Sequence, residues 1–500
     1  MSNGNLYARF ERVFESHAER VAIRTADGAS LTFGELARGA ARYANALSAL
    51  GVEPGDRVTV QVEKSIANVL LYLAVLKAGA VYQPLNTAYT AAEVSYFVED
   101  AGPKLIVCDP ARQPEMRTLA DKFGVFAVVN LDADGAGSLA TMAATMDDRH
   151  ETVARTADDF AGLLYTSGTT GRSKGAMVTH DNLASNAETL VELWRITSND
   201  TLLHALPIFH VHGLYTALNT AFLSAATMLW FNRFDAKAML AAMPQTTVMM
   251  GVPTFYTRLL AEPGFTRDTS RNMRLFISGS APLLAETHAE FSARTGHAIL
   301  ERYGMTETGM IASNPYDGDR VPGTVGFALP GVSVRIRGEQ PGVLEVRGPN
   351  VFKGYWRMPE KTREDFTADG WFITGDVCTI DAQGRVTIVG RAKDLIISGG
   401  FNVYPKEIEE VLDAVPGVGE SAVIGVPHPD FGEGVVAVMT AKGKLAPEAE
   451  IIATLSGSLA KFKVPKRIFA VDELPRNAMG KVQKAELRKR HAGLFRENRT

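Results

Sequence analysis

The feature that most constrains the fold is the alternation of two hydrophobic patterns along most of the chain. Short runs rich in Val, Ile and Thr, such as DRVTVQV (56–62) and TTVMMGVP (246–253), are bounded by turn residues and predict strands. Longer apolar segments at helical spacing lie between such runs, for example SIANVLLYLAVLKAG (65–79). Strands that alternate with helices form parallel sheets through crossover connections. The sequence therefore predicts an α/β architecture of βαβ units before Arg391.

Two further changes in pattern divide the 500-residue chain, which is too long for one typical core. Between Thr324 and Arg391, short strands and tight turns predict a small β-rich subdomain of the large domain. Beyond it, a helical segment, two strands and a lysine-rich end are typical of a separate small α+β domain. We therefore predict an N-terminal domain over 1–392 and a C-terminal domain over 393–500.

Composition and charge exclude several classes of protein. A formal net charge of -4 leaves no basic footprint for a nucleic-acid partner. The two cysteines, Cys108 and Cys378, lie far apart without metal-ligand spacing, which argues against a zinc site and fits a reducing compartment. The most apolar run, TAFLSAATMLWF (220–231), is too short to cross a bilayer. We expect a cytoplasmic protein without a membrane segment.

A stretch rich in hydroxyls and glycines, YTSGTTGRSKGAMVTH (165–180), could surround a phosphate group. It is not a Walker loop, because the residue five places after Gly168 is Ser173 where that motif needs glycine. Its hydroxyls, backbone amides and one mobile cation could wrap a polyphosphate, although a plain turn would have the same composition. The residues concerned are Thr166, Ser167, Gly168, Thr169, Thr170, Gly171 and Lys174.

Four further motifs follow in order, and each has an ordinary explanation when taken alone. ERYGMTET (301–308) places a hydroxyl and a carboxylate where they could hold a phosphate oxygen and Mg²⁺. WFITGDVCTIDAQGRVTIVGRAKD (371–394) contains an aspartate that could accept two ribose hydroxyls. SGGFNVYP (398–405) has a glycine pair that could admit a thin pantetheine arm, and LPRNAMGKVQK (474–484) carries a lysine after glycine.

Together and in this order, the motifs resemble those of the adenylate-forming superfamily of acyl-CoA synthetases, aryl-CoA ligases, luciferases and adenylation domains. The resemblance covers essentially the whole chain. It implies a loop from Thr166 to Lys174 around the ATP β- and γ-phosphates and an α-phosphate contact at Thr306. It also implies Mg²⁺ binding by Glu307 and catalysis by Lys481. Further contacts of the ATP nucleotide are implied for Ser280, Ala281, Glu301, Tyr303, Gly304, Asp376 and Arg391.

The same resemblance implies a reaction in two steps. A carboxylate first attacks the α-phosphate of ATP, and a lysine cation offsets the negative charge that accumulates. The CoA thiol then attacks the acyl-adenylate, after the mobile C-terminal domain has turned about Lys393 to bring Ser398, Gly399 and Gly400 to the pantetheine. Lys481 is also expected to be a target of a lysine acetyltransferase, because acetylation removes the required charge.

The acyl pocket holds clues to the acid. His210, His212, Arg258 and Arg302 stand in or beside segments that line this pocket in the family, and Met310 follows closely. An arginine beside a small pocket needs a second carboxylate as its partner. Alternatively, Arg258 is a surface helix residue and the histidines are residues of the core or of the CoA tunnel.

The motifs around Arg258, Arg302 and the glycine pair are similar to those of malonyl-CoA synthetases. They indicate malonate or a 2-substituted malonate such as methylmalonate as the acid. Val211, where threonine is common, and the apolar run GMIAS (309–313) favour room for the methyl group. A CoA synthetase for another short acid, an adenylation domain that loads a carrier protein and a non-enzymatic ATP-binding module are the alternatives. Lys481 and Glu307 argue against the last.

Overall fold

The computed structural model describes residues 3–166, 173–398, 401–477 and 480–495. Two compact units are present. The first comprises Met1–Pro322, Gly326–Ser333 and Val346–Phe372. The second comprises Gly323–Val325, Val334–Glu345 and Ile373–Thr500, so that residues 373–392 pack with the C-terminal part of the chain. The predicted division into domains over 1–392 and 393–500 stays a prediction.

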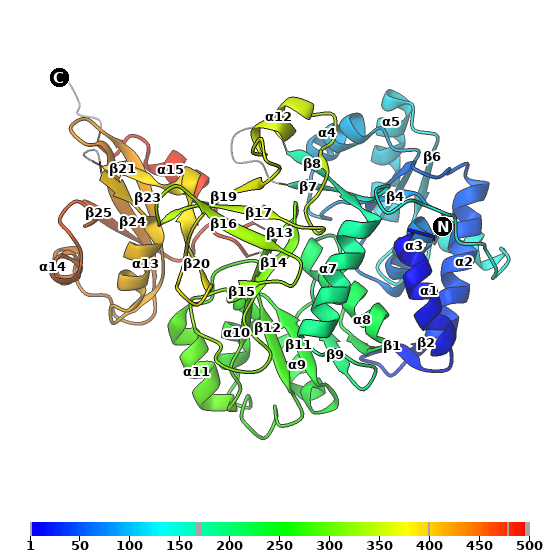
Figure 1. Cartoon of the computed structure of the whole chain (residues 1–500), viewed down its shortest axis with the longest axis horizontal. Helices are drawn as coiled ribbons and strands as arrows, with labels where there is room; N and C mark the ends of the chain where they lie inside the picture. The colour runs from blue at the N-terminus through cyan, green and yellow to red at the C-terminus, as the bar shows by residue number, and fades with distance from the viewer. Residues whose placement is uncertain (1–2, 167–172, 399–400, 478–479, 496–500) are drawn as a thin grey trace. The chain divides into compact units, whose positions relative to one another are not determined.

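The first unit contains a seven-stranded sheet in which a parallel core is extended by antiparallel strands at one edge (Figure 1). Its order is β18-β8-β7-β4-β3-β5-β6. β3 lies in the expected β-rich run over 56–62, and its pairings with β4 and β5 are parallel, which confirms the parallel βαβ pattern. The strands are β3 (Arg57–Gln61), β4 (Val81–Pro84), β5 (Leu105–Cys108), β6 (Ala127–Asn130), β7 (Phe160–Thr166), β8 (Lys174–Thr179) and β18 (Gly354–Tyr355).

A nine-stranded sheet with the order β15-β14-β13-β12-β11-β9-β10-β1-β2 forms the other half of this unit. Its central strands are parallel, while β2, β14 and β15 pair antiparallel at the edges. The strands are β1 (Val21–Thr25), β2 (Ser30–Thr32), β9 (Thr201–His204), β10 (Thr227–Trp230), β11 (Val248–Gly251), β12 (Leu275–Ser278), β13 (Leu300–Met305), β14 (Gly309–Ser313) and β15 (Phe327–Ala328).

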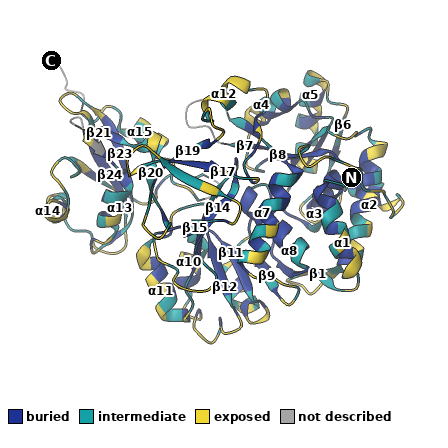
Figure 2. Ribbon diagram, in the orientation of Figure 1, coloured by how far each residue is buried: buried dark blue, intermediate teal, exposed yellow. Residues whose placement is uncertain are grey.

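Helices cover both sheets, and their exposed residues face outward (Figure 2). α3 confirms the helix predicted over 65–79; it is apolar on all sides and lies in the core. α7 begins with a capping box of Thr179 and Asn182 and contacts both β8 and β14, so it packs between the sheets. The α-helices of this unit are α1 (Leu6–Ser16), α2 (Phe33–Ala49), α3 (Ile66–Lys77), α4 (Ala91–Ala101), α5 (Gln113–Phe123), α6 (Ser138–Ala144), α7 (His180–Leu193), α8 (Asn219–Ser224), α9 (Ala236–Ala242), α10 (Pro253–Leu260), α11 (Ala285–Thr295) and α12 (Pro359–Glu364).

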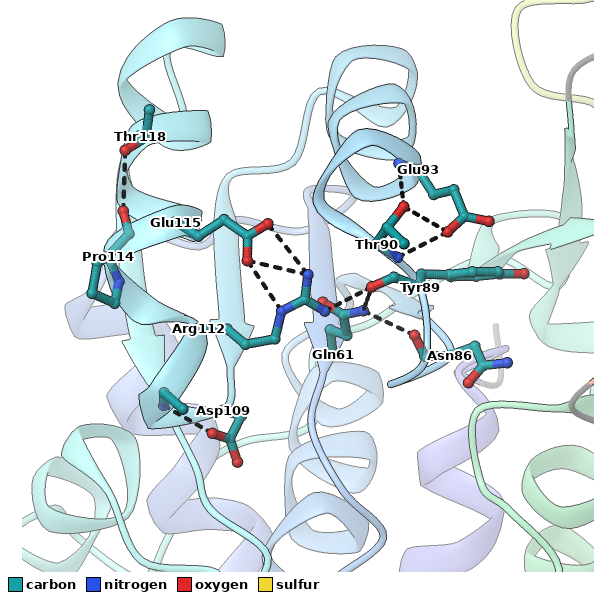
Figure 3. A network of polar contacts seen from close by, with 11 residues as sticks. Gln61, Asn86, Tyr89, Thr90, Glu93, Asp109, Arg112, Pro114, Glu115 and Thr118 are labelled. Carbon is teal, nitrogen blue, oxygen red and sulfur yellow. Dashed lines mark hydrogen bonds and ion pairs between the residues drawn. The ribbon is translucent and has the colours of Figure 1, made fainter.

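A polar network fixes the loop that follows β4 (Figure 3). The side-chain amide of Gln61 donates to the carbonyls of Asn86 (2.9 Å) and Tyr89 (3.2 Å). Arg112 donates to the same Tyr89 carbonyl at 2.9 Å and pairs with Glu115 at 3.3 Å. The loop therefore satisfies its backbone acceptors through side chains of β3 and of the turn before α5.

The second unit contains two sheets. β16 (Ser333–Arg337), β17 (Gly342–Arg347), β19 (Phe372–Ile380) and β20 (Val386–Arg391) form the first, which agrees with the β-rich pattern expected over 324–391. The second sheet is built around the long pair β23 and β24, and α13 covers it with apolar side chains such as Ile408 and Leu412. The remaining elements are β21 (Ile396–Ser398), β22 (Phe401–Val403), α13 (Pro405–Asp413), β23 (Val418–His428), β24 (Gly432–Ala441), α14 (Glu448–Ser458), β25 (Arg467–Val471) and α15 (Lys484–His491).

Membrane-spanning helices are absent from the described part of the chain, since none of its helices is both long and apolar enough.

Candidate active site

The two ends of the predicted phosphate loop are held together by the β7–β8 hairpin. Thr166 closes β7 and pairs in register with Lys174, the first residue of β8. The Lys174 ammonium lies 3.5 Å from Asp365 Oδ2 and 4.2 Å from the ring centroid of Tyr355. The remaining residues predicted for this loop lie outside the described part of the chain, namely Ser167, Gly168, Thr169, Thr170 and Gly171.

The predicted metal ligand lies in the tight turn between β13 and β14. Glu307 is buried, and one of its carboxylate oxygens accepts a hydrogen bond from the Tyr355 hydroxyl at 3.1 Å. Thr306 beside it is half-buried. The turn depends on Gly304, because a Cβ there would come within 2.2 Å of the Gly309 carbonyl oxygen. The sequence motif thus places a hydroxyl and a carboxylate side by side in a rigid turn.

Arg302 is a buried arginine on β13, with 4% of its surface exposed. Its guanidinium packs against Gly279, where a Cβ would approach Arg302 Nη1 to 2.3 Å. Among the described residues, Arg302 Nε and Nη2 have no hydrogen-bond partner. Burial lowers the pKa of Arg302 to about 9, which leaves it charged at neutral pH. A buried cation with unused donors requires an anion.

His212 lies next to this arginine and is also buried. Its Nδ1 is 3.3 Å from the Ser280 hydroxyl, and its Nε2 has no partner within the described chain. Burial, followed by the positive charges of Arg302 and His210, holds the pKa of His212 well below its usual range. His212 is therefore neutral at neutral pH and can offer an N–H donor. Ser280 has a φ of 73°, a left-handed conformation that is rare for residues other than glycine.

The other predicted pocket residues differ in their surroundings. The ring of half-buried His210 accepts from the His212 backbone N–H at 3.3 Å. Met310 is buried on β14, and Asn186 bonds to both its N–H and its carbonyl at 2.9 Å. Arg258 is exposed on α10, unlike Arg302, so the geometry gives no support to its predicted substrate contact, which stays a prediction.

Three further residues that are predicted to contact the nucleotide, Glu301, Tyr303 and Ala281, are buried or half-buried. Glu301 and Tyr303 are buried on β13, and the Glu301 carbonyl accepts from the side-chain amide of Asn314 at 3.1 Å. Ala281 is half-buried next to Ser280. Burial limits how much of Glu301 and Tyr303 a ligand can touch, so their role as nucleotide contacts stays a prediction.

In the second unit, the predicted ribose contacts form an ion pair. Asp376 on β19 and Arg391 on β20 are partners in register, and Arg391 Nε lies 2.7 Å from Asp376 Oδ1. Lys393 follows in a short helical turn, where burial lowers its pKa. Ser398 is buried at the end of β21, whereas Gly399 and Gly400 lie outside the described residues.

Lys481 lies in a hairpin that is closed by its own backbone. Its N–H donates to the Asn477 side-chain oxygen at 3.0 Å, and its carbonyl accepts from the Asn477 N–H at 2.9 Å. Desolvation, followed by the positive charges of Arg391 and Lys393, lowers the pKa of Lys481 to about 8. The residue as a whole is nevertheless exposed to solvent.

Ion pairs flank this hairpin on both sides. Before Lys481, Arg476 pairs with Glu420 of β23; after it, Lys484 Nζ lies 2.5 Å from Glu409 of α13. The sheet and helix of the second unit therefore hold the segment that carries Lys481.

Three residues that contact predicted site residues lie outside the sequence motifs. Asn186, Tyr355 and Asp365 come from segments distant in sequence from the groups that they contact, so no local pattern marks them.

The fold and these motifs define a class, the AMP-binding enzymes. The chain matches the model of the AMP-binding enzyme family over residues 10–356 and that of the AMP-binding enzyme C-terminal domain over residues 407–481, and it belongs to this family. This confirms the adenylate-forming architecture predicted from the sequence.

Among solved structures, ATP-bound MatB from Rhodopseudomonas palustris is similar, with 55% identity, a TM-score of 0.97, and coverage of 99% of this chain and 100% of that one. The malonate–CoA ligase of Arabidopsis thaliana is 34% identical over 97% of this chain and 89% of its own length. A feruloyl-CoA synthase of Amycolatopsis sp is 36% identical over 93% of this chain and 94% of its own. Relatives of similar identity are thus named for chemically different acids.

Proposed function

We propose that this chain is a malonyl-CoA synthetase that converts malonate or methylmalonate, ATP and CoA into the acyl-CoA, AMP and pyrophosphate through an acyl-adenylate. The observation that carries the choice of acid is Arg302, a buried cation whose Nε and Nη2 nitrogens have no hydrogen-bond partner among the described residues. Relatives named as malonate–CoA ligases support the same assignment. A monocarboxylate such as ferulate has no second anion to satisfy this arginine.

In the first half-reaction, a carboxylate oxygen of the acid attacks the α-phosphorus of ATP, and pyrophosphate leaves. Lys174 and the adjoining loop bind the β- and γ-phosphates, and the Thr306 hydroxyl donates to the α-phosphate. The buried Glu307 carboxylate, next to that hydroxyl, would hold Mg²⁺, and the bound ion would neutralise charge on the pyrophosphate. Lys481 provides a positive charge between the two reacting anions.

In the second half-reaction, the CoA sulfur attacks the carbonyl carbon of the acyl-adenylate, and AMP leaves. Asp376 and Arg391 bind the ribose, and the C-terminal domain turns about Lys393 so that Lys481 withdraws. Ser398, Gly399 and Gly400 then border the pantetheine arm. A cytoplasmic location and inhibitory acetylation of Lys481 by a lysine acetyltransferase belong to the same proposal.

Arg302 and the neutral His212 hold the carboxylate that does not react. The charged hydrogen bonds fix the acid by the end opposite to the attacking oxygen, which orients it for the in-line attack. A small cavity beside Thr306 is lined by Val211 and Gly309, so an apolar side chain borders the site. The methyl group of methylmalonate would lie next to Val211.

The experiment is to mix the protein with ATP, Mg²⁺, CoA and a panel of acids and to measure AMP release. We expect malonate and methylmalonate to be used far better than propionate, acetate or ferulate. Equal or better use of a monocarboxylate would contradict the proposal. Adenylate formation with no thioester from free CoA would favour an adenylation domain that loads a carrier protein.

A further inference from the structure

Tyr355 is a buried tyrosine whose place is fixed by the fold. It forms β18 with Gly354 and pairs in register with Ala176 of β8, and its N–H donates to the Thr362 hydroxyl at 2.9 Å. Its ring packs edge-on against Phe352 with the centroids 4.9 Å apart. With only 3% of its surface exposed, the side chain has no room to turn away.

Three charged groups from separate parts of the first unit meet at this side chain. The hydroxyl donates to Glu307 Oε1 at 3.1 Å, and the face of the ring lies 4.2 Å from the Lys174 ammonium. Asp365, at the end of α12, lies 3.5 Å from the same ammonium. A tyrosine hydroxyl keeps its proton at neutral pH, so the Tyr355 hydroxyl remains a donor.

We propose that Tyr355 is the positioning residue that connects the magnesium ligand Glu307 with the phosphate-loop cation Lys174. This inference rests on the roles proposed above for those two residues. The hydroxyl occupies one carboxylate oxygen of Glu307 and so sets the direction of the other toward the metal. The ring supports the ammonium of Lys174 by a cation–π contact at the base of the loop.

The burial and length of these contacts agree with the two roles, in which the hydroxyl orients Glu307 and the ring supports Lys174. Glu307 is 6% exposed, so its carboxylate needs hydrogen bonds to offset lost hydration, and the bond from the Tyr355 hydroxyl helps to fix its orientation. The Lys174–Asp365 pair is long, and both side chains are 21% exposed, so it is weak and a phosphate can displace Asp365. The aromatic face stays in place during that exchange.

Two substitutions separate the two roles. Tyr355→Phe keeps the ring and removes the hydroxyl; we expect the Mg²⁺ concentration for half-maximal adenylate formation to rise about 10- to 100-fold, with little change in the ATP KM at saturating Mg²⁺. Tyr355→Leu also removes the aromatic face, and we expect the ATP KM to rise in addition. Mn²⁺ binding in the presence of ATP, followed by electron paramagnetic resonance, gives a readout independent of turnover.

Tyr82→Phe is the matched control, because Tyr82 is a fully buried tyrosine whose hydroxyl donates to Asn68 at 2.7 Å. It should lower the melting temperature without changing the Mg²⁺ requirement. Glu307→Gln tests the metal ligand itself. If Glu307→Gln raises the Mg²⁺ requirement and Tyr355→Phe leaves both that requirement and Mn²⁺ binding unchanged, the positioning role is wrong. If Glu307→Gln has no such effect, the assignment of Glu307 as the metal ligand fails instead.

Discussion

Replacement of Arg302 by methionine tests the basis of the proposed acid specificity. Methionine approximates the length of the arginine stem and removes its charge and its donors. Two nitrogens of the guanidinium, Nε and Nη2, have no partner in the described chain, and hydrogen bonds to a charged group contribute about 1.5–3 kcal/mol each. We expect kcat/KM for malonate to fall by about 2–5 kcal/mol, or roughly 30-fold to several-thousand-fold.

Propionate isolates this effect, because it equals methylmalonate without the second carboxylate. Its kcat/KM should change much less in the variant, so the ratio of malonate to propionate is the quantity to measure. Folding should not suffer, since removal of an unpaired buried charge is neutral or stabilising. We therefore expect a melting temperature equal to or above that of the wild type.

The assay is AMP release with malonate, methylmalonate and propionate, measured for the wild type, Arg302→Met and Arg271→Met. Arg271 is a suitable control because 68% of its side chain is exposed and it pairs only with the nearby Asp268 among the described ion pairs. An unchanged malonate-to-propionate ratio in Arg302→Met would refute the reasoning. Equal losses for all three acids, with a raised ATP KM, would assign Arg302 to the nucleotide site.

Four further predictions concern the two half-reactions and the acid. Lys481→Ala should remove most adenylate formation, while thioester formation from presynthesised malonyl-adenylate survives; equal losses in separate half-reaction assays would contradict the two-conformation mechanism. The reaction needs the Lys481 cation, and the pKa of this residue is lowered to about 8, so the rate of adenylate formation should decline as the pH rises through that value. In a pH profile of Lys481→Arg, the decline should occur at a higher pH. Glu420→Gln weakens the ion pair with Arg476 and should slow adenylate formation by about tenfold, corresponding to ~1.4 kcal/mol, without slowing the thioester step. The reversed pair, Glu420→Arg with Arg476→Glu, should restore part of the rate. Val211→Thr should lower kcat/KM for methylmalonate relative to malonate by about 1–3 kcal/mol, and an unchanged ratio would place the methyl group elsewhere.

The sequence by itself determines the class of the protein and the order of its parts. Strands, crossover helices and the glycine turns are specified by patterns within a few neighbouring residues, which is why the βαβ units and the β-rich segment over 324–391 are predictable. The turn around Glu307 belongs to the same category, because Gly304 and Gly309 serve a close approach between nearby residues.

Contacts between distant segments are decided only by the tertiary structure. Arg258 and Arg302 both stand beside expected pocket segments, yet Arg258 lies on the exposed side of α10, opposite the buried Tyr256 and Leu259, whereas β13 carries Arg302 into the interior. Tyr355 likewise reaches Glu307 and Lys174 because β18 adds to the edge of the seven-stranded sheet. Contacts between such distant residues depend on strand order and helix packing, which arise from the burial of apolar surface across the whole unit. They leave no periodic pattern in the sequence around the residues that touch.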